Sequence, residues 1–307
     1  MPPALIGISI KILAVIFVVM IAVLVKTHPD GLPNTQLIFF RCFLALPFVI
    51  AFAYQQSHGD LTKTRIALTP KNLWLHIRRS SFGLTSMFLI FYSVRYAPLP
   101  IANALKELSP ILITMLAAVF LGEKIRLIRT LALLLGVLGV ALITYDTIGG
   151  ELRKTLGPEV TWGALAALGA AFTIALAQIQ IRSMIGRESP TAIVAMFFII
   201  GMIVTIPFAP FGWVAPSTQG WLWLIGIGFA GGLGQLCVTL CYQYADASTI
   251  APFEYFSIPF SLMLGGFLFD EWPHRNSLLG MGLILAGGLI IIYREGQLAN
   301  RERKSKQ

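Results

Sequence analysis

The sequence predicts an all-α integral membrane protein with ten transmembrane helices, arranged as two inverted five-helix repeats. Three observations carry this prediction: the composition, the number of apolar segments and an internal duplication. Of the 307 residues, 56% are hydrophobic and 12% are charged, and the mean hydropathy is +0.78. This composition leaves too little polar surface to coat a soluble globule of that size.

The apolar segments are each close to the roughly 20 residues that a helix needs to cross a hydrocarbon core. We expect spans at about residues 5–25, 36–54, 80–97, 100–121, 129–146, 160–181, 191–210, 220–243, 249–269 and 277–293. The first segment has no Lys or Arg before it, and it is too long for a signal-peptide core. We therefore expect it to stay in the mature protein.

A duplication organises these spans. Residues 96–145 recur without a gap, 148 positions later, as residues 244–293. The identical pairs are Tyr96/Tyr244, Ala97/Ala245, Ser109/Ser257, Met115/Met263, Leu116/Leu264, Glu123/Glu271, Leu131/Leu279, Leu135/Leu283, Gly139/Gly287, Ile143/Ile291 and Tyr145/Tyr293. We place the first repeat at residues 1–148, the second at residues 157–296 and a basic cytoplasmic tail at residues 297–307.

The Lys and Arg residues fall unevenly between the spans. One alternate set of connecting segments holds fifteen of them and the other set holds five. By the positive-inside rule, both termini are predicted to be cytoplasmic, in a bacterial-type inner membrane. Because each repeat has five spans, the second repeat starts on the opposite side and is inverted. Inverted repeats give a carrier two interchangeable conformations, one open to each side.

The sequence lacks the motifs of several other classes of protein. No Gly-x-x-x-x-Gly-Lys-Ser/Thr loop is present, so no ATP-driven engine is expected. No His, Cys or Asp cluster has metal-ligand spacing, and we expect neither a metal nor a cofactor. The net charge is +9, but the Lys and Arg residues lie between apolar segments rather than in a patch interleaved with aromatic residues. Nucleic acid is therefore not an expected partner.

Two sets of motifs resemble a known family. Tyr-Ala-Pro-Leu-Pro-Ile-Ala-Asn-Ala at 96–104, Leu-Ser-Pro at 108–110 and Leu-Gly-Glu at 121–123 resemble the fourth span of EamA-type permeases of the drug/metabolite transporter superfamily. The segments 244–255 and 269–271 resemble the ninth span. The resemblance implies a ten-helix basket with a central cavity and alternating access. It implies no single substrate, since the family carries amino acids, nucleotide-like cofactors, riboflavin and xenobiotics in either direction.

Five charged residues lie inside expected spans: Lys11, Arg41, Lys106, Glu107 and Glu254. Charges at membrane depth are costly and usually face a bundle interior or a wet cavity. Lys106 and Glu254 are repeat mates, and charges at Lys106 and Glu107 depart from the usual family pattern. We predict one pair between Arg41 and Glu107 and another between Lys11 and Glu254. Lys106 would then meet an anionic or electron-rich part of the substrate, and Glu254 would exchange a proton.

These assignments have structural alternatives. Lys11 could instead extend its amine to the cytoplasmic face, and Arg41 could extend outward beside Gln36. Pro252 and Pro259 bracket Glu254 and are expected to weaken the local helix. We expect Lys106→Ala or Glu254→Gln to abolish uptake with folding intact, whereas Arg41→Ala would harm folding first.

Further candidates are polar or aromatic. Asn103 is predicted to share a helical face with Lys106. Aromatic side chains that could stack on a planar substrate, although packing or an interface belt is the alternative, include Tyr96, Tyr244 and Tyr255. Glu123 and Glu271 sit at the ends of spans and are interpreted as loop anchors.

The predicted function is secondary transport of a small organic metabolite. The pattern around residues 7–11 and 251–255 resembles riboflavin- or S-adenosylmethionine-type uptake permeases. An exporter of amino acids or xenobiotics and a passive channel stay open as alternatives. A membrane-embedded enzyme would need clustered Asp, His and Ser at one interface, which the sequence does not show.

Overall fold

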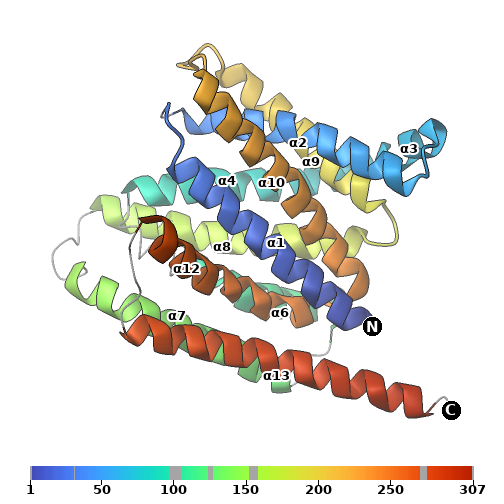
Figure 1. Cartoon of the computed structure of the whole chain (residues 1–307), viewed down its shortest axis with the longest axis vertical. Helices are drawn as coiled ribbons and strands as arrows, with labels where there is room; N and C mark the ends of the chain where they lie inside the picture. The colour runs from blue at the N-terminus through green and yellow to red at the C-terminus, as the bar shows by residue number, and fades with distance from the viewer. Residues whose placement is uncertain are drawn as a thin grey trace. The chain divides into compact units, whose positions relative to one another are not determined.

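The computed structural model describes residues 2–30, 32–96, 105–123, 127–151, 158–269 and 275–305, and within these ranges it contains helices and no strand. The helices are α1 (Pro3–Lys26), α2 (Asn34–Gln56), α3 (Leu61–Leu68), α4 (Leu73–Tyr96), α6 (Ser109–Leu121), α7 (Leu127–Glu151), α8 (Pro158–Met184), α9 (Pro190–Thr205), η1 (Ile206–Phe208), α10 (Thr218–Tyr244), α11 (Ala247–Ile250), η2 (Ala251–Phe256), α12 (Ser257–Phe269) and α13 (Arg275–Ser305). Figure 1 shows their course along the chain.

The chain forms two compact units. Unit 1 contains Met1–Ile12, Phe82–Ile179 and Tyr244–Gln307, and unit 2 contains Leu13–Ser81 and Gln180–Gln243. The boundaries fall inside α1, α4 and α8 and before the last residue of α10, so each of these helices contributes residues to both units.

Most of the expected spans correspond to apolar helices. Five helical segments are long and apolar enough to cross a membrane: Pro3–Val25, Asn34–Gln56, Thr161–Met184, Pro190–Phe208 and Thr218–Tyr244. Shorter apolar helices occupy Ser109–Leu121, Leu127–Gly139 and Leu278–Arg294. Residues 80–96 of the third expected span lie within α4. The chain is therefore a multi-pass membrane protein, and the total of ten spans stays a prediction.

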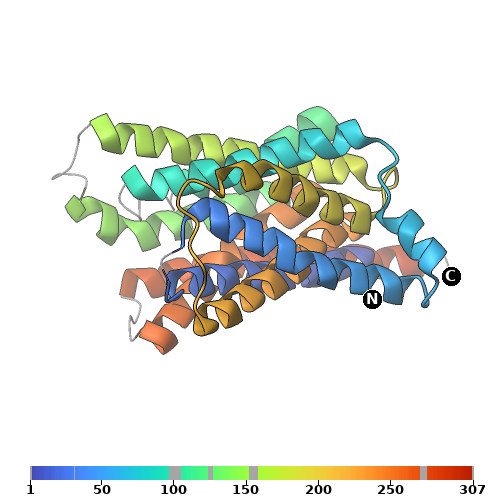
Figure 2. The ribbon, with the colours of Figure 1, turned by 90° about the horizontal axis from the view of Figure 1, so that it is seen from above.

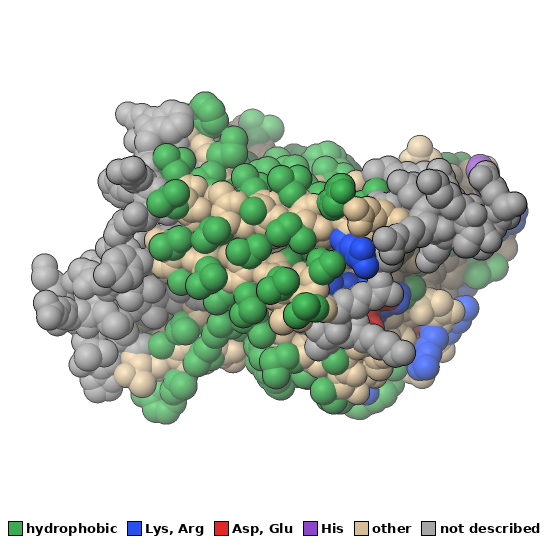
Figure 3. Space-filling view, turned by 90° about the horizontal axis from the view of Figure 1, so that it is seen from below, with side chains coloured by type: hydrophobic (Ala, Val, Ile, Leu, Met, Phe, Trp, Pro, Cys, Tyr) green, Lys and Arg blue, Asp and Glu red, His purple; other side chains and the backbone are tan. Residues whose placement is uncertain are grey.

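Apolar side chains face outward along these helices, as lipid contact requires. Large exposed residues include Leu131, Leu134 and Leu138 on α7, and Leu278 and Leu289 on α13. The face drawn in Figure 3 is covered by apolar side chains, with Lys and Arg gathered toward one end. An apolar surface of this extent is unfavourable in water and favourable in a bilayer.

The ninth expected span is broken, as its prolines predict. α11 is followed by the 3₁₀ segment η2, and the α-helix resumes only at Ser257 as α12. Pro252 lies at the start of η2 and Pro259 near the start of α12. Each proline lacks an N–H donor and crowds the preceding turn, which favours a break over a continuous α-helix.

The starts of two helices follow the duplication. α6 begins at Ser109 and α12 begins at Ser257, 148 positions later. The repeat in the sequence is therefore matched by the point at which these two helices begin.

In unit 1, α7 and α13 lie alongside each other (Figure 1). A Cβ atom on Gly139 would lie 2.6 Å from the carbonyl oxygen of Gly280, and one on Gly287 would lie 3.0 Å from that of Ala132. The contacts pair Ala132 with Gly287 and Gly139 with Gly280, so residue numbers rise along α7 where they fall along α13, and the two helices are antiparallel. Both contacts are related by the 148-residue shift, and small residues permit this close approach.

Unit 2 is built on the contact between α2 and α9, and α3 lies beside the end of α2 (Figure 2). Gln36 is buried; its amide nitrogen donates to the carbonyl oxygen of Val214 at 2.6 Å, and its oxygen accepts from the Val214 N–H at 3.1 Å. Two caps fix helix starts. Asp60 accepts from two amides of α3 at 2.8 and 3.1 Å, and Ser189 accepts from the Ala192 N–H of α9 at 3.0 Å.

Candidate functional site

Lys11 and Glu254 form a buried ion pair within unit 1. Lys11 lies on α1 and is 1% exposed, and its amine donates to Oε1 of Glu254. Gln178 of α8 donates from Nε2 to the same oxygen at 2.6 Å. The predicted Lys11–Glu254 pair is confirmed, and the alternative in which Lys11 reaches the cytoplasmic face is wrong.

The broken helix explains where this pair sits. Glu254 lies in η2, between the short helix α11 and the longer α12. The side chain of Glu254 retains 22% exposure while that of Lys11 has 1%. A buried charge needs a partner and satisfied hydrogen bonds, and here the lysine and the glutamine supply both. Sequence reasoning missed Gln178, although polar Gln178 and Gln180 interrupt the apolar run of α8.

Lys106 and Glu107 also pair with each other. The Lys106 amine lies 3.2 Å from Oε1 of Glu107, and the Ser257 hydroxyl donates to that oxygen at 3.4 Å. The expectation that Lys106 is left unpaired is therefore wrong. Consecutive residues diverge on a regular α-helix, but here the chain makes a turn at Glu107 and Leu108 before α6 begins. Asn103 lies outside the described residues.

The four side chains Lys11, Lys106, Glu107 and Glu254 form one cluster, which we call the charge cluster. Lys106 lies within electrostatic range of Glu254 as well as Glu107, and the two carboxylates lie within range of each other. The cluster is formally neutral, with two ammonium and two carboxylate groups. Its members come from α1 and from the residues just before or within the helix breaks of the two repeats.

Arg41 belongs to unit 2, whereas Glu107 belongs to unit 1. The predicted pair between them stays a prediction. Arg41 is partly exposed, and its side chain lies against α10: a Cβ atom on Gly231 would be 3.1 Å from Cγ and from Nε of Arg41.

Arg79 lies one residue before the third expected span, residues 80–97, so the sequence places it in a connecting segment. In the structure it lies on α4 and is 3% exposed. Its guanidinium carbon lies 3.8 Å from the ring centroid of Phe197 on α9. The helical period was an available signal, because Arg79, Gly83 and Ser86 fall on one small or polar face and all are buried.

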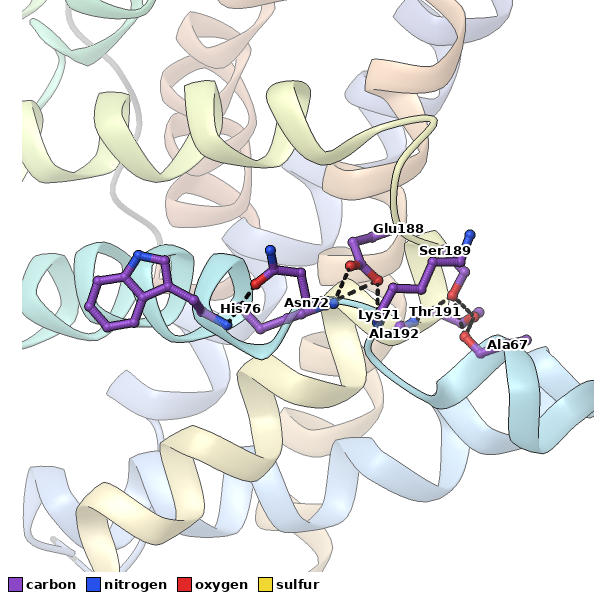
Figure 4. A network of polar contacts seen from close by, with 9 residues as sticks. Ala67, Lys71, Asn72, His76, Glu188, Ser189, Thr191 and Ala192 are labelled. Atoms are coloured by element: carbon purple, nitrogen blue, oxygen red, sulfur yellow. Dashed lines mark hydrogen bonds and ion pairs between the residues drawn. The ribbon is translucent and has the colours of Figure 1, made fainter.

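Unit 2 also contains a polar network, which joins the segment before α9 to the segment before α4 (Figure 4). Glu188 accepts from the N–H groups of Lys71 at 3.0 Å and Asn72 at 2.8 Å, and it lies 3.4 Å from Nε2 of His76. Burial lowers the pKa of His76, and Glu188 opposes this only in part. Burial also raises the pKa of Glu188, but the two amide hydrogen bonds and His76 outweigh it and lower that pKa.

Glu123 anchors a loop, as predicted. It accepts from the N–H groups of Ala247 at 3.0 Å and Ser248 at 2.9 Å, and from the Ser248 hydroxyl at 2.7 Å. Arg129 of α7 donates to the same hydroxyl at 2.8 Å. These bonds fix the start of α11 to the segment after α6. The repeat mate Glu271 lies outside the described residues.

The tyrosines divide by burial. Tyr255 is 1% exposed and packs against α7, where a Cβ atom on Gly136 would lie 2.2 Å from its ring. Tyr244 is 40% exposed, and the ring of Tyr96 is tilted against that of Tyr92 with 4.5 Å between the ring centroids. The geometry of Tyr255 is that of a packing residue, which was the alternative to stacking on a substrate. A stacking role for Tyr96 or Tyr244 stays a prediction.

The family model for EamA-like transporters matches residues 5–145 and again residues 161–293. The chain belongs to the EamA-like transporter family. It is thus a membrane transporter rather than an enzyme. The earlier resemblance to the drug/metabolite superfamily is confirmed.

Relatives named for different solutes align over most of the EamA-like chain. An S-adenosylmethionine uptake transporter of Rickettsia conorii is 26% identical and covers 90% of this chain and 88% of its own length. The pseudopaline exporter CntI of Pseudomonas aeruginosa is 26% identical with 93% of both chains covered. A riboflavin transporter of Vibrio cholerae is 26% identical, covering 89% and 87%. A solved structure with a TM-score of 0.76 and 20% identity covers 94% of this chain and 98% of its own, which shows a shared fold.

Proposed function

We propose that the chain is a secondary transporter that moves a small organic metabolite across the bacterial inner membrane by alternating access. The observation that carries the proposal is the charge cluster at a break in a membrane helix. Transporters of this general design place their sites where helices are interrupted, because freed backbone groups and side chains can then meet the solute. Glu254 within η2 and its repeat mate Lys106 before α6 occupy such positions in unit 1.

An inverted repeat is part of this proposal. The matched starts of α6 and α12, and the antiparallel contact of α7 with α13, support two repeats at residues 1–148 and 157–296. Two separate matches of the family model support the same division. Helices that are equivalent by sequence and opposite in direction are what inversion of a five-span unit produces.

The cluster suggests how solute and conformation are linked. Two ammonium groups and two carboxylates balance each other, so a solute that replaces one partner must offer a similar charge. A proton on Glu254 would weaken its bond with Lys11 and free both Lys11 and Gln178 to rearrange. We propose that the binding and release of this proton accompany the switch between the conformations open to the two sides of the membrane.

For the solute, we propose an uptake substrate of the S-adenosylmethionine or riboflavin type. A neutral cluster with both signs of charge suits a zwitterionic or strongly polar metabolite better than a purely apolar one. Relatives named as an uptake transporter and a riboflavin transporter support this class. The relative named as an exporter supports the alternative direction, so export of amino acids or xenobiotics is the second candidate.

The experiment is a ligand screen followed by a flux assay. Purified full-length protein is heated in detergent with flavins, nucleosides, S-adenosylmethionine and amino acids, and hits are tested in proteoliposomes. A carrier is expected to show uptake that accelerates when the same solute is loaded on the other side. Uptake without such acceleration would indicate a channel, and no uptake of any stabilising solute would contradict the proposal.

The proposed orientation has its own test. Reporters fused after Gln307 and within residues 55–79 should both register as cytoplasmic, and one within residues 149–158 should register as periplasmic. A periplasmic signal at the carboxyl terminus would overturn the orientation.

A further inference from the structure

The short helix α3 lies between the ends of two helices that are able to span a membrane. It begins at Leu61, and only residues 57–60 separate it from the end of α2 at Gln56. Its last turn is bonded to the start of α9, because the hydroxyl of Thr191 donates to the carbonyl oxygen of Ala67 at 2.9 Å. Both α2 and the segment that begins with α9 are long and apolar enough to cross a bilayer. α3 therefore lies at one surface of the membrane, beside both spans (Figure 2).

Hydrogen bonds fix which face of α3 points outward. Asp60 caps its first turn, and the hydroxyl of Ser189 also donates to the carbonyl oxygen of Ala67 (Figure 4). Thr64 is 5% exposed, so this side of the helix packs on the protein. The residues around it on the opposite side are all exposed, namely Leu61, Thr62, Lys63, Arg65 and Ile66. The outward face of α3 is thus held in place by the fold.

The exposed side chains of this region are large apolar groups mixed with basic ones. Leu61 is 74% exposed, and Ile66 and Trp74 are each 66% exposed. We call the following exposed side chains the interfacial surface: Leu61, Lys63, Arg65, Ile66, Lys71 and Trp74. Apolar side chains flanked by Trp and by Lys or Arg are typical of segments that lie at the boundary between headgroups and acyl chains.

The charge of this surface is positive. Besides its own three basic residues, Arg78 and Arg187 are exposed nearby, since Arg78 lies one turn after Trp74 and Arg187 precedes Glu188. Glu188 is buried and binds the amides of Lys71 and Asn72.

The remaining acidic residues of unit 2 do not balance this charge. The sequence places only Asp30 and Asp60 there besides Glu188. Asp30 precedes α2 and so lies toward its opposite end, and Asp60 offsets one charge by pairing with Lys63 at 3.7 Å. A surface with this excess of basic side chains is complementary to anionic headgroups.

We propose that the interfacial surface binds anionic phospholipid, with Leu61, Ile66 and Trp74 inserted among the acyl chains and Lys63, Arg65 and Lys71 on the headgroup phosphates. Long basic side chains can bury their stems beside apolar groups while the charge stays at the headgroups. In the proposed orientation this lipid belongs to the cytoplasmic leaflet. The surface requires only that the chain spans a membrane, so a result against it leaves the transport proposal intact.

The test is amide hydrogen exchange of the full-length protein in nanodiscs of phosphatidylcholine, with or without phosphatidylglycerol. The amides of residues 64–69 report on α3, because they are hydrogen-bonded within the helix and its carboxyl-terminal cap. They are expected to exchange about tenfold or more slowly in the anionic discs, since each Lys or Arg near such a surface contributes about a factor of five. Glycerol 3-phosphate added to the neutral discs should have no such effect.

Two matched pairs of variants separate charge from local structure. The double variant Lys63→Gln, Arg65→Gln should remove most of the difference between the two lipids, whereas Lys63→Arg, Arg65→Lys keeps both charges and should retain it. Arg294→Gln removes a charge from α13 in unit 1 and should also retain it. Ile66→Ser should speed exchange about tenfold in both discs, because Ile and Ser have similar helix propensities and only the insertion is lost. Thr62→Ser, at an exposed position of the same helix, should leave exchange unchanged.

Each outcome supports or overturns the surface. Equal exchange in the two lipids, or a difference that persists in Lys63→Gln, Arg65→Gln, would overturn the binding of anionic lipid. Slowing by glycerol 3-phosphate alone would show a site for free phosphate instead of a lipid surface. Unchanged exchange in Ile66→Ser would overturn the insertion of the apolar side chains. All substitutions are at exposed or partly exposed positions, where the expected change in stability is small, so the variants are expected to fold.

Discussion

The Lys11–Glu254 pair can be tested by a double-mutant cycle. Lys11→Met removes the ammonium group and keeps the length of the side chain. Glu254→Gln removes the carboxylate charge and keeps a carbonyl oxygen that can accept from Gln178, which now donates to Oε1 at 2.6 Å. The double variant removes both charges together.

The expected sizes follow from burial. Removing one partner of a buried ion pair costs about 3–5 kcal/mol of unfolding free energy, whereas replacing both is often close to neutral. Lys11 is 1% exposed and Glu254 is 22% exposed, so the carboxylate left by Lys11→Met can recruit water. We therefore expect Glu254→Gln to lie at the upper end of that range and Lys11→Met at the lower end. This replaces the sequence-based expectation that Glu254→Gln leaves folding intact.

The assay measures the unfolding of the purified protein in detergent, induced by denaturant or by heat. Lys63 provides the control, because its amine lies 3.7 Å from Asp60 in a pair that is 73% and 40% exposed. Lys63→Met should change stability by less than about 1 kcal/mol. If the double Lys11→Met, Glu254→Gln variant loses the sum of the two single losses, the side chains are not coupled and the reasoning fails.

Three further predictions concern packing, pH and capping. Gly139→Ala should destabilise by about 1–3 kcal/mol because its Cβ would meet a backbone oxygen at 2.6 Å, whereas Gly282→Ala, with nothing within 4 Å, should be neutral or slightly stabilising in the same melt. The fold lowers the pKa values of His76 and Glu188, so the unfolded chain binds protons at a higher pH than the folded chain, and the stabilisation from both groups should be complete above pH 6.5 and decrease as the pH falls. Glu188→Gln should reduce the loss of stability below pH 4.5. An unchanged dependence of stability on pH in this variant would refute the prediction. Glu123→Ala should raise amide hydrogen exchange at residues 247–248, and unchanged exchange would contradict its anchoring role.

Local patterns predicted much of the fold. The 148-residue repeat is matched at the starts of α6 and α12, which open on the identical residues Ser109 and Ser257. The prolines at 252 and 259 anticipated η2. The antiparallel approach of Gly139 to Gly280 required tertiary structure, since neither glycine indicates its partner.

The candidate site was only partly predictable. Lys11 and Glu254 were matched by estimated depth, which sufficed because both lie about as far from the same end of their spans. Estimated depth in the membrane could not predict the ion pair between Lys106 and Glu107, because that contact depends on a local turn of the chain rather than on distance along a helix axis. Arg79 was missed because a charge at the end of an apolar segment looks the same in sequence whether its side chain points outward or into the unit.

The central claim is that the charge cluster serves transport and is more than a structural ion pair. The most direct measurement is counterflow of a stabilising solute in proteoliposomes that contain the double Lys11→Met, Glu254→Gln variant, normalised to folded protein. Because the double variant is expected to fold, a stability defect cannot account for a loss of flux. We predict counterflow at the level of empty vesicles. Counterflow near that of the wild type would contradict the claim and reduce Lys11 and Glu254 to structural partners.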